Sequence, residues 1–225
     1  MKNMYTAAVT CLLLAVLPST LFAQKSIRGN GIVTTQNRSV EPFTKIKING
    51  VFDVIINQGN EETVVVLTDD NLQSLVTVEV TNGTLCVGLK LKSNFKEYTK
   101  MNILITLKSI NELTNSLVGN LSNTGTLNLP QLTYTSSAVG NAMLNVQCNT
   151  LILKLKAVGD TNLTGTAKQC TITNSSVGNV NASKLIATTL TLQNTAVGNT
   201  TINAATLTHT NHAVGNVLNV YYAGK

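Results

Sequence analysis

The chain has 225 residues, of which 43% are hydrophobic and only 4% aromatic, with no tryptophan. Its formal net charge is +6. The lysines are scattered and are not interleaved with stacking aromatic residues, which argues against a nucleic-acid groove. This composition favours a thin aliphatic core, and the length suits one solenoid or two small subdomains.

The first 23 residues have the features of a signal peptide. Lys2 supplies the positive end, residues 7–17 form a short apolar stretch, and Ala23 precedes a plausible cleavage site. Later runs all fall short of the roughly 18 apolar residues that a membrane helix needs, so we expect no transmembrane segment after cleavage. The sequence therefore predicts an exported protein that is periplasmic, held on the outer surface or secreted.

The first half of the mature chain is expected to be irregular. Residues 24–42 form an N-terminal extension in this interpretation, and residues 43–110 form an N-terminal β region. Alternating apolar residues predict strands over 43–49, 52–56, 64–67, 76–80, 85–91 and 101–107. Asn82-Gly83 between two such runs predicts at least one hairpin. Residues 93–100 are the most loop-like internal stretch, which predicts an exposed projection.

The second half carries a repeated tripeptide. Its six copies are Val118-Gly119-Asn120, Val139-Gly140-Asn141, Val158-Gly159-Asp160, Val177-Gly178-Asn179, Val197-Gly198-Asn199 and Val214-Gly215-Asn216. The glycines are separated by 21, 19, 19, 20 and 17 residues. A repeat period near 20 residues, with alternating apolar positions between the tripeptides, is typical of a solenoid.

Each repeat contains a short alternating strand. The positions eight and six residues before the glycines are mostly apolar and share a parity, so we expect them to face inward. They are Asn111, Leu132, Leu151, Cys170, Leu190 and Leu207, then Leu113, Tyr134, Leu153, Ile172, Leu192 and His209. The sequence therefore predicts an all-β fold, with a right-handed parallel β-helix of about 20 residues per coil over residues 111–225. His209 is expected to fill the last coil, and Tyr221 and Tyr222 to cover its end.

The tripeptide itself is interpreted as a structural corner. Glycine gives the backbone freedom for a tight turn, and the following side chain can hydrogen-bond to its neighbours in the stack. We expect a corner ladder in which each amide bonds the one above and the one below. Its members are Asn120, Asn141, Asp160, Asn179, Asn199 and Asn216. The three cysteines of the mature chain, Cys86, Cys148 and Cys170, lack metal spacing and are interpreted as small buried hydrophobes.

Several segments together resemble a known family. They are residues 43–50 and 52–59, the Asn82-Gly83 turn, residues 101–107 and the serial Ser-x-Val-Gly-Asn corners. In this order they resemble the family named putative auto-transporter adhesin, head GIN domain, over residues 43–224 as one domain. The resemblance implies a β fold, export in a Gram-negative bacterium and adhesion. The family's corners read Ser-Gly-Ala-Gly, whereas this chain has alanine or serine at the first of those glycines.

The same repeat limits the possible functions. From residue 113 to the end Asp160 is the only acidic residue and arginine is absent, so the carboxylates of a polysaccharide-active β-helix enzyme are missing. We expect a non-catalytic protein without cofactor or metal. The outward positions offer a binding face, made of Thr133, Thr135, Thr171, Thr173, Thr191, Gln193, Thr208 and Thr210.

Such a face suits a glycan or protein partner at the cell envelope. Two alternatives remain open: a structural protein that associates with copies of itself, and an ice-binding surface. Ile152 and Lys154 interrupt the threonine rows, which disfavours ice binding.

Overall fold

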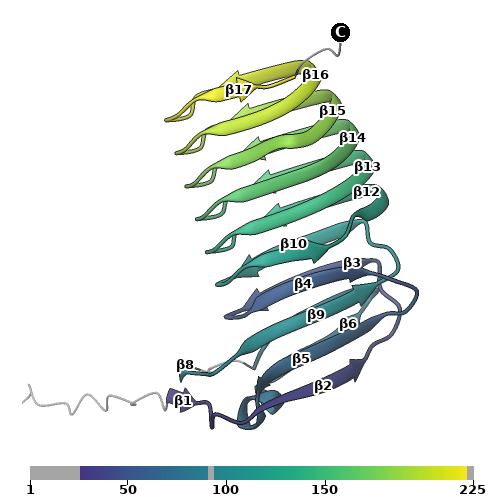
Figure 1. Cartoon of the computed structure of the whole chain (residues 1–225), viewed down its shortest axis with the longest axis vertical. Helices are drawn as coiled ribbons and strands as arrows, with labels where there is room; N and C mark the ends of the chain where they lie inside the picture. The colour runs from purple at the N-terminus through teal and green to yellow at the C-terminus, as the bar shows by residue number, and fades with distance from the viewer. Residues whose placement is uncertain (1–25, 91–93, 222–225) are drawn as a thin grey trace, which may run out of the picture.

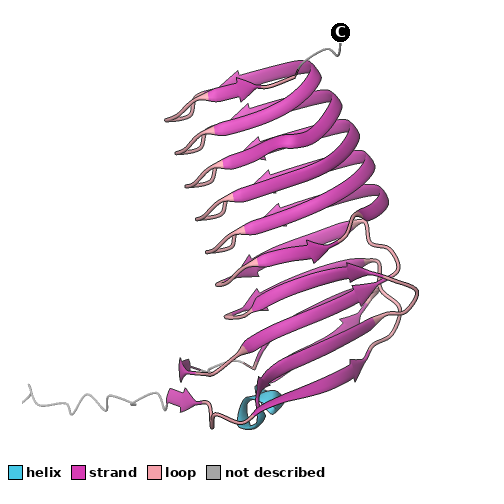
Figure 2. Cartoon of the chain, viewed as in Figure 1, coloured by secondary structure: helices cyan, strands magenta, loops and turns pink. Residues whose placement is uncertain are grey.

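The computed structural model describes residues 26–90 and 94–221, and the predicted signal peptide and Tyr222 lie outside them. The described chain is almost entirely β (Figure 2). The strands are Ser26–Arg28 (β1), Val33–Ser39 (β2), Lys45–Gly50 (β3), Asp53–Gln58 (β4), Thr63–Asp69 (β5), Val76–Thr81 (β6), Thr84–Leu89 (β7), Asn94–Glu97 (β8), Met101–Leu107 (β9), Glu112–Leu117 (β10), Leu121–Thr124 (β11), Leu127–Ser136 (β12), Ala142–Leu155 (β13), Thr161–Asn174 (β14), Val180–Asn194 (β15), Thr200–Asn211 (β16) and Val217–Asn219 (β17). One 3₁₀ helix, η1, covers Asp70–Leu75.

The repeats stack as parallel coils, which confirms the solenoid (Figure 1). Strands β12 to β16 pair in parallel and in sequence order, and each long strand bends so that one coil supplies two sides of the stack. Leu132, Leu151, Cys170, Leu190 and Leu207 are successive register partners. The repeat period read from the glycines is therefore the length of one coil.

The first half continues the stack rather than standing beside it. β3 pairs in parallel with β10, and β4 with β11, so these two strands lie directly below the repeats. β7 and β9 extend the same two sides by one further parallel step. Antiparallel strands then follow: β6 on β7, β5 on β9 and β2 on β5. The change from parallel to antiparallel pairing closes the N-terminal end of the coil pattern.

The predicted hairpin is present between β6 and β7. Thr81 pairs with Thr84 across the Asn82-Gly83 turn. Both turn residues have positive φ, 50° for Asn82 and 70° for Gly83, the geometry that matches the twist of the flanking strands.

The expectation of a loop-like projection over residues 93–100 is wrong in part. This stretch contains β8, which pairs in parallel with β1 to form a separate two-stranded sheet. Asp69 at the end of β5 holds this sheet in place. Its carboxylate accepts hydrogen bonds from the backbone N–H of Gly31 at 2.8 Å and of Thr99 at 2.7 Å, and from the Thr99 hydroxyl at 2.9 Å. Strand pairing with a distant segment was not visible in the local composition.

Asp69 predicts a pH dependence of stability. Burial raises the pKa of this carboxyl, but the hydrogen bonds from Thr99 and Gly31 outweigh burial, so its pKa lies below the ordinary value of 3.8. A carboxyl whose pKa is lower in the folded than in the unfolded protein contributes its full stabilisation at pH values above the unfolded-state pKa. This contribution is lost as the pH falls through the folded-state pKa. We expect Asp69→Asn to be less stable than the wild type at pH 7 in urea unfolding. The difference in unfolding free energy between the wild type and the variant should become smaller below about pH 4. A difference that stays constant down to pH 2 would contradict this role of Asp69.

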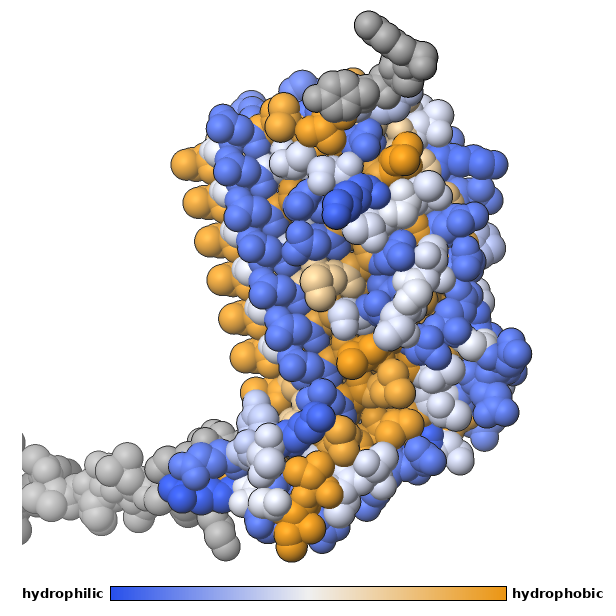
Figure 3. All heavy atoms as spheres, viewed as in Figure 1, coloured by the Kyte–Doolittle hydropathy of each residue, from blue (hydrophilic) through white to orange (hydrophobic). Residues whose placement is uncertain are grey.

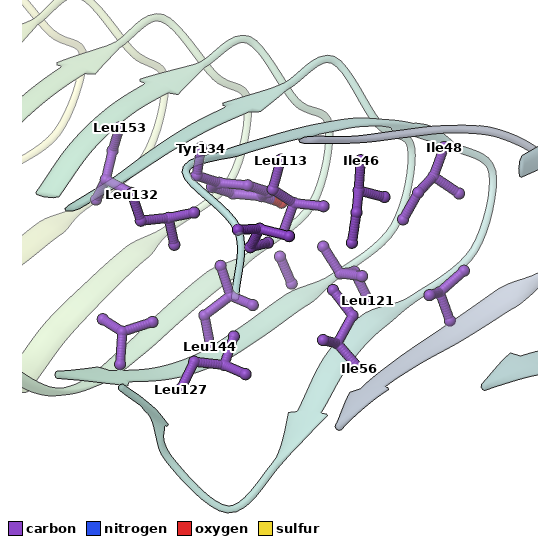
Figure 4. Close-up of a cluster of buried hydrophobic side chains, with 14 of the residues drawn as sticks. Ile46, Ile48, Ile56, Leu113, Leu121, Leu127, Leu132, Tyr134, Leu144 and Leu153 are labelled. Carbon is purple, nitrogen blue, oxygen red and sulfur yellow. The ribbon is translucent and has the colours of Figure 1, made fainter. Parts of the chain in front are cut away.

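The core is a continuous aliphatic column inside the coils (Figure 4). Ile46, Leu113, Tyr134 and Leu153 are successive partners on one wall, and all are at most 1% exposed. Leu121, Leu127 and Leu144 close the core from other strands. The inward positions expected from parity are therefore confirmed for the inner coils.

The last coil differs from the expectation for His209. His209 pairs with Leu192 and keeps the register of the inward positions, yet its side chain is exposed. Among the described residues β17 covers β16 only at Thr200–Ile202, so nothing packs over His209 there. Tyr221 is 39% exposed and Tyr222 lies outside the described residues, so the cover over the coil end stays a prediction.

Side-chain amides complete the backbone ladder where strand pairing stops. Asn219 accepts a hydrogen bond from the Ala204 N–H at 3.0 Å and donates to the Ala204 carbonyl at 2.9 Å, as a paired strand would. Asn123 does the same for Asn145, and Gln58 for Asn128. The backbone groups satisfied in this way are buried at Ala204, half-buried at Asn145 and exposed at Asn128.

Candidate functional site

The corner of each coil is made by the repeated glycine. Gly159 has a φ of 128°, a conformation that residues with a side chain rarely adopt. A Cβ on it would lie 2.4 Å from the carbonyl oxygen of Gly140 in the neighbouring coil. Glycine is thus required both for backbone conformation and for the close approach of successive corners.

The residue after each glycine forms the predicted column, with a different hydrogen-bond pattern. Each side-chain oxygen accepts from the backbone N–H of the next member. The side-chain amide of the next member donates as well only where the acceptor is an aspartate, at 3.3 Å from Asn179 to Asp160 and at 3.2 Å from Asn120 to Asp53. The N···O distances are 3.1 Å for Asn141 on Asn120, 3.0 Å for Asp160 on Asn141, 2.8 Å for Asn179 on Asp160, 3.0 Å for Asn199 on Asn179 and 3.0 Å for Asn216 on Asn199. Asp53 continues the column by accepting from the Asn120 N–H at 2.7 Å. Since only an oxygen acceptor is needed, aspartate fits the column as well as asparagine does.

An amide-to-amide ladder exists at another position, which the sequence interpretation missed. Asn174 donates from Nδ2 to Oδ1 of Asn194 at 3.0 Å, and Asn194 donates to Asn211 at the same distance. Asn174 and Asn194 are each 1% exposed. These side chains lie four residues before the glycine, at an inward-facing position, so a polar ladder replaces part of the apolar core near the corner.

The valine of the tripeptide faces solvent. Val118, Val139, Val158, Val177, Val197 and Val214 are register partners in consecutive coils. The first five are 50–51% exposed and Val214 is 73% exposed. In Figure 3 a row of hydrophobic side chains projects along one edge of the stack, beside a hydrophilic column. We call these six valines the Val ridge. The sequence interpretation had assigned valine only a role in the turn.

The predicted binding residues lie on one side of the stack, called the Thr face from here on. One row is Thr133, Ile152, Thr171, Thr191 and Thr208, and the next is Thr135, Lys154, Thr173, Gln193 and Thr210. Thr133 and Thr135 are half-buried, and the other six predicted residues are exposed. Rows are spaced by about 6.6 Å along a strand and about 4.8 Å between coils. The structure therefore brings the eight predicted residues onto one flat surface.

The Thr face is larger than the sequence indicated. A third row, which was not among the predicted binding residues, contains Gln131, Thr150, Gln169, Thr189 and Thr206. Toward the N-terminus the first two rows continue through Glu112 with Lys45 and Thr114 with Lys47. Lys45 and Glu112 form an ion pair of 3.4 Å on the surface. Glu112 and Thr114 lie seven and five residues before Gly119, so the parity rule already contained the signal for them.

A groove runs along the edge of the Thr face opposite the Val ridge. It has a volume of about 480 Å³ and crosses the four coils of β12 to β15. Leu129, Cys148 and Ala167 form its floor, and Lys168 stands on the wall nearer the Thr face. The full lining is Asn128, Leu129, Pro130, Gln147, Cys148, Asn149, Thr166, Ala167, Lys168, Ile186 and Thr188. The groove was not predicted, and its floor follows no single residue type, because the position eleven residues before the glycine is Leu129, Cys148 and Ala167 in successive coils.

Reactive groups are few in the described surface. Burial raises the pKa of the Cys148 thiol to about 11, and burial with the neighbouring Cys148 raises that of Cys170 to about 12, so both thiols stay protonated at neutral pH. Cys86 is half-buried, so the interpretation of the cysteines as buried hydrophobes holds fully only for Cys148 and Cys170. No three His, Cys, Asp or Glu side chains gather around a possible metal position in residues 26–90 and 94–221. The same residues include no helix with the length and hydropathy needed to cross a membrane.

The fold and its surfaces define a parallel β-solenoid protein that displays rows of hydroxyl and amide groups. The chain belongs to the family described as "putative auto-transporter adhesin, head GIN domain", whose model matches residues 42–224. The resemblance inferred from the motifs is thereby confirmed. No protein of curated function matches the sequence.

Three solved structures share this architecture. A protein titled putative adhesin from Bacteroides fragilis is 24% identical with a TM-score of 0.81, over 87% of this chain and 100% of that one. A protein titled putative lipid binding protein from Parabacteroides distasonis is 15% identical with a TM-score of 0.61, over 88% and 98%. One titled putative adhesin from Parabacteroides merdae is 18% identical with a TM-score of 0.56, over 87% and 99%. Because the sequence identities are 24% or lower, these structural similarities show a shared fold only.

Proposed function

We propose that the protein is an exported, non-catalytic adhesin-like binding protein that holds a glycan or protein partner at the cell envelope through its Thr face. The observation that carries this proposal is the alignment of three rows of hydroxyl and amide side chains on one flat side of the stack. The family's adhesin name supports the same conclusion.

The chemistry of the face favours a glycan over a charged ligand. Between β12 and β16, its eight predicted residues are seven threonines and one glutamine, which donate and accept hydrogen bonds without a net charge. Lys154 is the one charged side chain in the three rows over those strands. Neutral sugars present hydroxyl groups that pair with such side chains. The regular spacing also allows several units of a linear chain to be held at once, which adds avidity to weak single contacts.

Removing hydroxyl groups at the centre of the face should test this role. We expect the triple variant Thr171→Ala, Thr173→Ala, Thr191→Ala to lose about tenfold or more of its affinity, because several hydrogen bonds are removed together. A broad glycan array followed by titration with the best ligand measures the effect, with a pull-down from envelope fractions for protein partners. The variant should keep the wild-type unfolding midpoint, since all three residues are exposed. If the wild type shows no glycan or protein partner at micromolar concentration, the proposal is wrong.

A further inference from the structure

The Val ridge is not explained by the needs of the backbone. At other outward positions of the same coils a β-branched residue is usually threonine, as at Thr171, Thr191 and Thr208. Threonine would suit the extended corner as well as valine does. Nevertheless, all six corners carry valine, about half exposed or more. The internal repeats therefore indicate that an apolar side chain is required there, and a continuous exposed apolar stripe marks an interaction surface.

The surroundings of the ridge indicate what kind of surface it meets. One flank is the asparagine column, and the other consists of Ser116, Ser137, Lys156, Ser175, Thr195 and His212. These flanks contain no Trp, Phe or Tyr and a single lysine, whereas a membrane-binding surface has aromatic side chains and clustered lysines. Six partly exposed valines amount to a patch of about 300–600 Å², less than the about 800 Å² per partner of a standard interface. A convex ridge gains more contact from a concave partner than from another ridge.

The chain itself carries a concave surface that fits the ridge. The groove runs parallel to the ridge along the same stack. Each coil contributes one valine to the ridge and one set of lining residues to the groove, so the two surfaces repeat with the same spacing. The groove spans four coils, which matches four consecutive valines, and its floor is the apolar set Leu129, Cys148 and Ala167. Ile186, 55% exposed, adds an apolar wall. We propose that the Val ridge of one copy docks in the groove of a second copy, so that the molecules associate side by side.

Charges select the orientation of the two copies. Lys168 carries the only charge among the groove-lining residues that the structure describes. Beside the ridge, exposed Lys156 precedes Val158 on the Thr-face flank, and exposed Asp160 follows it on the opposite flank. With parallel stacks Lys156 would face Lys168, whereas antiparallel stacks bring Asp160 toward Lys168. The charges therefore favour antiparallel neighbours whose Thr faces point to opposite sides.

This contact has a consequence for assembly. The ridge and the groove are different patches at opposite edges of the Thr face. After a single contact, one copy therefore keeps a free groove and the other keeps a free ridge. Such head-to-tail contacts form open rows rather than closed dimers. Each contact is small, and we expect association to be weak in dilute solution. Docking of the ridge in the groove is independent of ligand binding by the Thr face.

Sedimentation velocity over a range of concentrations tests the docking. The chain from Gln24 onward should show a weight-average mass that rises with concentration up to about 1 mM. The double variant Val158→Thr, Val177→Thr keeps β-branched side chains and should weaken association about tenfold or more, with an unchanged circular dichroism spectrum. Thr191→Val, outside both patches, is the matched control and should associate like the wild type. A wild type that remains monomeric throughout, or a Val158→Thr, Val177→Thr variant that associates normally, would overturn the proposal.

A double-mutant cycle tests the orientation. Asp160→Asn keeps the oxygen that the column requires, and Lys168→Gln keeps the length of the side chain. We expect each to weaken association about two- to fivefold, as for an exposed ion pair, and the double variant to be no weaker than either single variant. Additive losses would show that the two charges do not meet, and would overturn the antiparallel arrangement. Thr-face variants with normal association but no glycan binding would separate this inference from the proposed function.

Discussion

Gly159→Ala is expected to destabilise the protein by about 3–5 kcal/mol, among the largest effects of any single substitution in the chain. Two penalties act together. The φ of 128° is strained for any residue with a Cβ, and that Cβ would lie 2.4 Å from Gly140 O and 2.8 Å from Gly140 C. Because the contact is to backbone of the next coil, it can be relieved only by separating two coils. Urea unfolding of the variant measures the loss.

Gly125→Ala is the matched control for this prediction. Gly125 also has a positive φ, 65°, but a Cβ there would have no atom within 4 Å. Only the backbone penalty applies, so we expect a loss of about 1–2 kcal/mol. Equal losses for the two variants would mean that the close stacking of corners adds nothing to the requirement for glycine.

Asn194→Leu is expected to cost about 2–4 kcal/mol although leucine fits its position. Leu155 occupies the same column two coils earlier, which shows that an aliphatic side chain is accommodated. The loss arises because Asn174 Nδ2 is buried and would keep only its 3.3 Å contact to Thr200, and a buried donor without its partner costs about 1–3 kcal/mol. Packing changes around the substituted amide add to this cost. Thermal and urea unfolding give the difference in stability.

Asn199→Ala provides the comparison on the solvent side. Asn199 belongs to the exposed column, where water can replace the bond that its Oδ1 makes to Asn216 N at 3.0 Å. We expect a loss of about 1 kcal/mol or less. If Asn199→Ala is as damaging as Asn194→Leu, burial does not distinguish the two asparagine columns as we describe.

The fold was predictable because the repeats act as an alignment of the chain with itself. Six corners in register identify inward and outward positions, and strand parity then places Leu132, Tyr134 and Leu153 in the core. The Asn82-Gly83 turn predicts its hairpin from local chemistry alone. The family assignment follows from the order of these parts and is confirmed over residues 42–224.

Features that depend on distant or terminal contacts were not predictable. Strand parity predicts an inward position for His209. It does not predict that the side chain is exposed, because burial also requires a further coil above that position. The pairing of β8 with β1 joins segments that are far apart in sequence. The Val ridge was missed because valine is usually buried, whereas at a corner the outward direction is set by the turn. The groove depends on how far each coil bends, which no local pattern states.

We propose that the Thr face binds the partner and that the tripeptide columns build the scaffold. A titration series separates these two roles: the best array ligand is titrated against the wild type, the Thr171→Ala, Thr173→Ala, Thr191→Ala variant and Asn199→Ala, all at a concentration where they are folded monomers. We predict that only the Thr-face variant loses affinity, about tenfold or more, while Asn199→Ala binds like the wild type. Undiminished binding by the Thr-face variant, or an equal loss in Asn199→Ala, would contradict this division of roles.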